Sequence, residues 1–147
     1  KMCHSFGRLP WIQAVRMTSS NQVSATARNV LGEPLVVCGC EPMTGWHRDG
    51  FCETDAADRG QHSICCVMTE AFLRYSKAQG NDLSTPMPAF QFPGLKPGDH
   101  WCVCAPRWKQ AYEDGMAPLV RLEATEDTAL LVVPLEQLKE HAYQGIS

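Results

Sequence analysis

Residues 92–108 place the strongest limits on how this chain can fold. The stretch holds two Pro-Gly turns, at residues 93–94 and 97–98, followed by a short apolar run with two cysteines and two tryptophans. Pro and Gly favour the backbone angles of tight turns, so we expect the second turn to lead into a strand at residues 100–104. Pro106 suits the first turn of a helix, so the order predicted here is turn, strand, helix.

The rest of the chain alternates short apolar runs with helical patterns. We expect further strands at residues 35–37, 63–68, 120–124 and 130–133. Thr69 and Pro134 should each open a helix, and the inward residues of the first should be Ala71, Phe72, Tyr75 and Ala78, before a stop at Gly80. The helix that contains Pro106 should bury Trp108, Ala111 and Tyr112. This irregular order predicts an α+β fold: one two-layer domain with a small, mostly antiparallel sheet and about three helices.

The charge of the chain is unevenly distributed. The first 32 residues hold four of the 13 basic residues and none of the 16 acidic ones. We therefore interpret residues 1–28 as a disordered or targeting-like basic head, with Met17 as an alternative start, and residues 29–147 as the single domain. The expected location is the cytoplasm, or a mitochondrion or plastid if the head is a transit peptide.

The acidic body also limits the partners. Nucleic-acid binding needs a basic surface that displaces counterions, so we expect no nucleic-acid partner. No apolar run approaches the roughly 20 residues that span a bilayer, so we expect no membrane association. A small molecule or another protein is left as the partner.

Eight cysteines in 147 residues make thiol chemistry the main question. In a strand, Cys102 and Cys104 would point to the same face about 6–7 Å apart, which is too far for a bond between them. Each would meet a thiol from another segment, for which the candidates are Cys38, Cys52 and Cys65. Cys65 and Cys66 should point to opposite faces, so at least one belongs to the core. Buried structural thiols, a metal site and redox chemistry all stay open.

Several separated motifs resemble one small family. They are Asn-Val-Leu-Gly-Glu-Pro-Leu at residues 29–35, Arg-Asp-Gly at 48–50, Gly-Asn-Asp-Leu-Ser-Thr-Pro at 80–86, the stretch 92–108, and Leu-Glu-Ala-Thr at 122–125. The family is known as domain of unknown function 2237, and the resemblance covers about residues 29–142. It implies an α+β fold and carries no activity, substrate or cofactor.

The resemblance also sorts the candidate residues. Positions where the family has cysteine are Cys38, Cys52, Cys65, Cys102 and Cys104, and other motif positions are Asp49, His62, Asn81, Asp82, Arg107 and Trp108. Cys40 and Cys66 are additions of this chain. Phe51 stands where family members often have another cysteine, which weakens any site that needs the full set of thiols.

These residues give three groups of candidates. The candidate ligands of a zinc or iron ion are Cys38, Cys52, Cys65, Cys102, Cys104 and His62. The candidate catalytic residues are Cys102, Cys104 and Arg107, whose positive charge could favour a thiolate. A cleft for an anionic ligand could use Arg48, Asp49, Asn81 and Asp82, although Asp and Asn equally often cap turns.

Two functions follow from these groups. The first is a small cysteine-rich binding domain with clustered thiols and a structural zinc or iron. The alternative is a thiol-dependent redox or transfer enzyme that uses Cys102 or Cys104.

Overall fold

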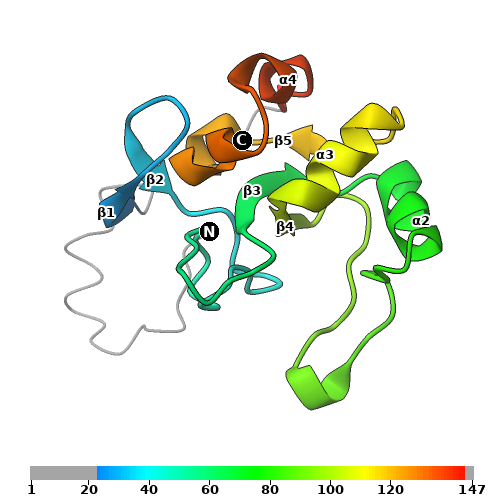
Figure 1. Cartoon of the computed structure of the whole chain (residues 1–147). Coiled ribbons are helices and arrows are strands. Elements are labelled where there is room, and N and C mark those ends of the chain that lie inside the picture. The colour runs from blue at the N-terminus through cyan, green and yellow to red at the C-terminus, as the bar shows by residue number, and fades with distance from the viewer. Residues whose placement is uncertain (1–22, 145–147) are drawn as a thin grey trace.

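The computed structural model describes residues 23–144, so the predictions about residues 1–22, including the start at Met17, lie outside it. The described chain forms the expected α+β domain, with two small antiparallel sheets rather than one (Figure 1). In the larger sheet, β3 (His62–Val67) lies between β4 (His100–Cys104) and β5 (Leu119–Val120). In the smaller sheet, β1 (Val23–Arg28) pairs with β2 (Pro34–Val36). Strand β1 thus lies inside the segment interpreted as the basic head.

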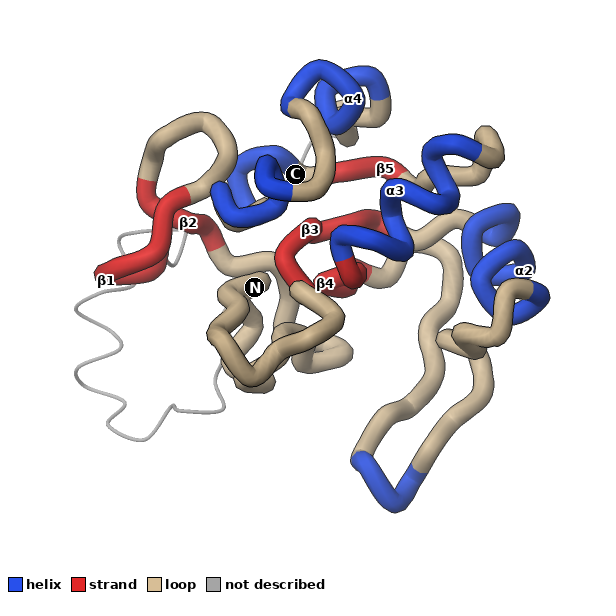
Figure 2. The backbone as a smooth tube through the Cα atoms, viewed as in Figure 1, coloured by secondary structure: helices blue, strands red, loops and turns tan. Residues whose placement is uncertain are grey.

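Three α-helices flank the sheets in the described part of the chain (Figure 2). They are α2 (Glu70–Ala78), α3 (Ala105–Glu113) and α4 (Leu135–Glu140). Short 3-10 turns are η1 (Pro88–Phe90), η2 (Leu122–Ala124) and η3 (Asp127–Leu131). Within residues 23–144 no helix has both the length and the apolar character needed to cross a bilayer.

The main core lies between the larger sheet and the helices. Ile64 and Val103 of the sheet, Trp108 and Ala111 of α3 and Phe72 of α2 are all at most 2% exposed and belong to one apolar cluster. The cluster confirms the inward positions of Trp108 and Ala111. Since α3 follows β4 directly, this packing fixes the end of β4 against the helix.

Helix α2 begins and ends where the sequence indicates. Thr69 caps it, because its side-chain oxygen accepts a hydrogen bond from the Phe72 amide at 3.1 Å. Gly80 follows the helix with a φ of +92°, which favours glycine. The predicted apolar face was partly wrong. Ala71 and Ala78 are exposed, and the buried residues of α2 are Phe72, Leu73 and Ser76.

Of the two strands predicted in the C-terminal part, one is much shorter than expected and the other is replaced by a 3-10 turn. Strand β5 ends at Val120, and the chain then turns at η2, where the Ala124 amide donates to the Arg121 carbonyl at 3.1 Å. The strand expected at residues 130–133 was also wrong, because η3 extends into that stretch. Ala129 and Val133 are fully buried while Leu131 is 83% exposed, so the apolar positions follow a turn and not an alternating strand.

Candidate functional site

The ladder between β3 and β4 brings two predicted cysteines together. Cys65 and Cys102 are direct partners across the two strands, and opposite residues in an antiparallel pair point to the same face. Cys66 points to the other face and belongs to the main core, as the alternation predicts. One face of the sheet therefore carries two adjacent sulfurs.

The irregular loop after β2 supplies two more sulfurs. Cys38 forms a disulfide with Cys65, and Cys52 forms one with Cys102. The Cα–Cα distances are 5.7 and 5.2 Å, which are ordinary for disulfides. Cys102 thus meets a thiol of another segment, as expected, and both ends of the loop at residues 38–52 are attached to the sheet.

The two disulfides form one cluster. The sulfur atoms of Cys38, Cys52 and Cys102 all lie within 4.8 Å of one another, and Cys65 is bonded to the first of them. The four residues are between 0 and 2% exposed and pack with Ala124. We call these four residues the sulfur cluster. Water has almost no access to it.

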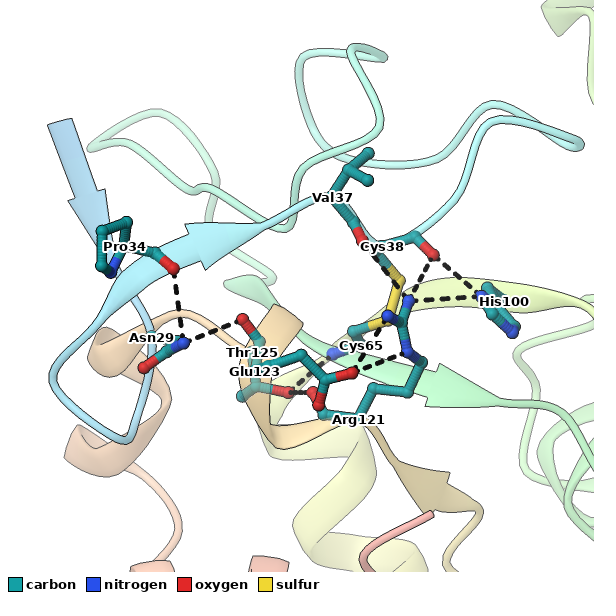
Figure 3. Close-up of polar contacts among 9 residues, drawn as sticks. All are labelled: Asn29, Pro34, Val37, Cys38, Cys65, His100, Arg121, Glu123 and Thr125. Carbon is teal, nitrogen blue, oxygen red and sulfur yellow. Dashed lines mark hydrogen bonds and ion pairs between the residues drawn. A yellow bond between two sulfur atoms is a disulfide. The ribbon is translucent and has the colours of Figure 1, made fainter. Parts of the chain in front are cut away.

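Polar groups hold the backbone around the sulfur cluster (Figure 3). The Arg121 guanidinium donates to the carbonyl of Cys38 at 3.0 Å, and His100 Nδ1 lies 2.8 Å from the same oxygen. On the other side, the Thr125 hydroxyl oxygen accepts from the Cys65 amide at 3.1 Å and donates to the Arg121 carbonyl. The same guanidinium forms an ion pair with Glu123 at 3.0 Å, so a charge-balanced pair borders the cluster.

Cys104 and His62 lie apart from the sulfur cluster and contact each other. The Cys104 sulfur is 3.2 Å from His62 Nε2, and His62 Nδ1 is 2.8 Å from Asp58 Oδ1. The six candidate metal ligands therefore fall into two groups, four in the cluster and two here. Among the described cysteines, Cys104 and Cys66 carry free thiols, and Cys104 is the more exposed of the two.

A bulge in β3 explains why His62 faces Cys104. Cys65 opposes Cys102 and Ile64 opposes Val103, so an unbroken ladder would put Ser63 opposite Cys104. The register shifts between His62 and Ile64, and His62 takes that place instead. Sequence alternation alone could not reveal this shift.

Burial, together with the Asp58 carboxylate, raises the pKa of the Cys104 thiol to about 11, although Arg107 of α3 lowers it in part. Burial likewise raises the pKa of Cys66 well above the ordinary value. Both thiols are therefore mostly protonated at neutral pH.

One family model matches residues 28–142, nearly the whole described chain. Its description is "Uncharacterized protein conserved in bacteria (DUF2237)". The chain belongs to this family. No curated protein matches the sequence. Membership confirms the expected resemblance, and the five cysteines predicted to occupy family positions all lie in one of the two groups above.

The candidate ligand-binding residues of the family motifs serve turns. Asp49 Oδ1 accepts from the Phe51 amide at 3.0 Å, and Arg48 donates to the Gly45 carbonyl while its guanidinium lies over the Trp101 ring. Asp82 accepts from the Thr85 hydroxyl at 2.7 Å, which lowers its pKa. The role of these residues in ligand binding stays a prediction.

Asn81 closes a helix, and Asp58 supports the candidate His62. The Asn81 carbonyl accepts from the Ser76 hydroxyl at 2.6 Å, so its backbone ends α2. Asp58 was missed by sequence reasoning, although its side chain is fully buried and bound to His62. An acidic residue four positions before a motif histidine is the signal that could have indicated it.

Proposed function

We propose that the sulfur cluster is a metal-binding centre, which holds one zinc or iron ion when its four cysteines are reduced. The observation that carries the proposal is the convergence of its sulfurs: three lie within 4.8 Å of one another, and the fourth is bonded to one of these three. The two disulfides are the oxidised form of the same centre. The protein is then a small cysteine-rich binding domain.

The size of the sulfur cluster suits an ion with tetrahedral coordination. With zinc–sulfur bonds of about 2.3 Å, the sulfurs of a tetrathiolate site lie roughly 3.8 Å apart. The sulfur of Cys38 already lies within 4.8 Å of those of Cys52 and Cys102, but these two are bonded to each other and must separate to reach that spacing. Cys65 must separate from Cys38, which reduction of their bond permits.

Metal binding fits the burial of the cluster better than redox turnover. Reduction of two disulfides takes four electrons and four protons, which two equivalents of a dithiol reductant supply, and each attacking thiolate must reach a sulfur. Sulfurs of residues that are at most 2% exposed resist that attack in the folded protein. The metal is therefore expected to enter while the chain folds under reducing conditions.

The test is elemental analysis of protein that is produced and purified under a reducing agent throughout. We expect close to one zinc or iron per chain in the wild type and in Cys104→Ser. Cys52→Ser removes one ligand of the sulfur cluster and should lose most of the metal. Cys104→Ser is the matched control, because it removes a thiol outside the cluster.

Two results would contradict the proposal. One is metal-free reduced protein that unfolds at the same temperature as the oxidised form. The other is metal loss in Cys104→Ser but not in Cys52→Ser, which would move the site to Cys104 and His62.

The alternative from the sequence, a thiol-dependent enzyme, had two candidate nucleophiles. Cys102 is bonded to Cys52 and offers no thiol in this state. Cys104 carries a free thiol in contact with an imidazole. Chemistry that needs a free thiol is therefore proposed at Cys104 alone.

A further inference from the structure

We infer that Cys104, His62 and Asp58 form a nucleophilic catalytic site that transfers acyl groups from esters or amides. This inference deepens the alternative function at Cys104 and does not depend on metal in the sulfur cluster. It rests on a line of three side chains, from thiol to imidazole to carboxylate. The order is that of a nucleophile, a general base and the group that orients the base.

The hydrogen bonds set the state of the imidazole. Both oxygens of Asp58 are used by His62: Oδ1 lies 2.8 Å from the ring Nδ1, and Oδ2 accepts from the backbone amide at 2.9 Å. A carboxylate only accepts, so Nδ1 carries the proton. Nε2 of the neutral ring is then left as an acceptor, 3.2 Å from the Cys104 sulfur.

The Asp58 and His62 side chains differ in exposure in the way that catalysis requires. The Asp58 side chain is fully buried, while that of His62 is 32% exposed. The carboxylate can therefore hold the ring firmly, and Cys104, at the other end, is only partly buried. Trp46 lies over the imidazole, with the ring planes 17° apart, and is itself 41% exposed.

The backbone at Gly60 leaves room for the pair. A Cβ atom at this position would lie 2.9 Å from the Cys104 sulfur and 3.0 Å from His62 Cε1. The φ of Gly60 lies outside the left-handed region, so its backbone does not itself demand glycine. A side chain at this position would therefore press on the thiol and the imidazole themselves.

The charges around the Cys104 sulfur favour removal of its proton during the attack over a thiolate formed beforehand. Burial and Asp58 raise the thiol pKa to about 11, and Arg107 opposes them. Proton removal during the attack avoids the cost of a free thiolate. Cys104 also directly precedes the nine residues of α3, whose N-terminal dipole favours negative charge that develops there.

The reaction follows from these roles. As the Cys104 sulfur bonds to the carbonyl carbon of the substrate, its proton passes to His62 Nε2. The bond from carbon to the leaving oxygen or nitrogen then breaks, and the leaving group takes that proton, which leaves a thioester on Cys104. Water then attacks the thioester carbon and gives a proton to Nε2, the carbon–sulfur bond breaks, the sulfur takes that proton from Nε2, and the acyl group leaves as a carboxylic acid. Asp58 is a positioning residue throughout.

The substrate class follows from the need for a proton shuttle. Alkoxide and amine leaving groups require a proton as they depart, and His62 is placed to return one. Exchange with a disulfide needs no such return, because a thiolate leaves readily. Esters and amides are therefore the substrates that use all three side chains.

The test uses the oxidised full chain and the ester p-nitrophenyl acetate. We expect a burst of p-nitrophenolate at neutral pH and an acetyl group on Cys104 in the mass spectrum. His62→Gln should slow acetylation by about 100-fold, in line with the loss of a general base. Gly60→Ala should also slow it, because the new methyl group separates the sulfur from Nε2. The matched control is Cys66→Ala, which removes a buried core thiol and should react like the wild type.

The pH profile of the wild type tests the proton transfer from Cys104 to His62 even if a variant fails to fold. Assisted attack predicts that the acetylation rate levels off as the pH rises, and that Asp58→Asn changes this profile as well as the rate. A rate that rises tenfold per pH unit without levelling off would instead report an unassisted thiol and overturn the inference. A His62→Gln variant that folds and is acetylated as fast as the wild type would overturn it as well.

Discussion

Cys65 and Cys102 oppose each other across the β3–β4 ladder, yet neither is bonded to the other. Each is bonded to a cysteine of the loop after β2 instead. The two disulfides therefore attach this irregular loop to the larger sheet at two points. The same ladder ends in the bulge that brings His62 to Cys104. Both candidate sites thus depend on one pair of strands.

Loss of one disulfide should destabilise the oxidised protein. The residues of the Cys38–Cys65 pair are 27 positions apart, and closure of such a loop contributes about 3.5 kcal/mol in the chain-entropy account. The double variant Cys38→Ala/Cys65→Ala should lower the free energy of unfolding in urea by roughly that amount. Cys104→Ser is the control and should cost less than half as much. Equal losses would mean that the covalent link contributes little.

The two Pro-Gly turns should respond differently to alanine. Gly94 and Gly98 both have positive φ, of 83° and 95°. A Cβ at Gly94 would lie 2.4 Å from the Ser84 carbonyl oxygen, whereas nothing lies within 4 Å at Gly98. We expect Gly98→Ala to cost about 1 kcal/mol and Gly94→Ala at least twice as much, measured by thermal unfolding. Similar costs would show that residues near Ser84 move easily.

Asp114 should control the titration of Tyr75. The two side chains share a short hydrogen bond that raises the pKa of the Tyr75 phenol to about 12. Because the folded pKa exceeds the ordinary value of about 10, this contact stabilises the fold fully below pH 10, and the effect is lost as the pH rises towards 12. Tyrosinate absorbance should show the midpoint falling towards 10 in Asp114→Asn. An unchanged midpoint would rule out the hydrogen bond as the cause.

Thr44 should contribute more to the stability of the fold than its place in an irregular loop indicates. It is fully buried, and its hydroxyl oxygen accepts from the Cys102 amide at 2.9 Å. Thr44→Val would leave that buried amide without this partner, which costs about 1–3 kcal/mol in urea unfolding. The exposed Thr26→Val in β1 is the control and should change stability by less than about 0.5 kcal/mol. A tolerated Thr44→Val would mean that the amide finds another acceptor.

Local signals predicted much of the fold correctly. Thr69, Gly80 and Pro106 act within a few residues along the chain, through a side-chain cap, a positive φ and a fixed φ. Such effects do not depend on distant segments, so the boundaries of α2 and α3 could be read from the sequence. The failures at residues 120–124 and 130–133 occurred where apolar runs had no such signal, and burial against the rest of the domain decided their shape.

The sequence by itself determined the family, the α+β class and the importance of its cysteines, because residue types and spacing carry that information. Only the tertiary structure decided which cysteines meet. Register places Cys65 beside Cys102, and a one-residue bulge moves His62 next to Cys104 and divides the candidate ligands into two groups. A register shift reverses which face a side chain occupies without changing any local preference. The contact between the buried Asp58 and His62 could not be predicted from the sequence either, because it depends on how the loop before β3 packs.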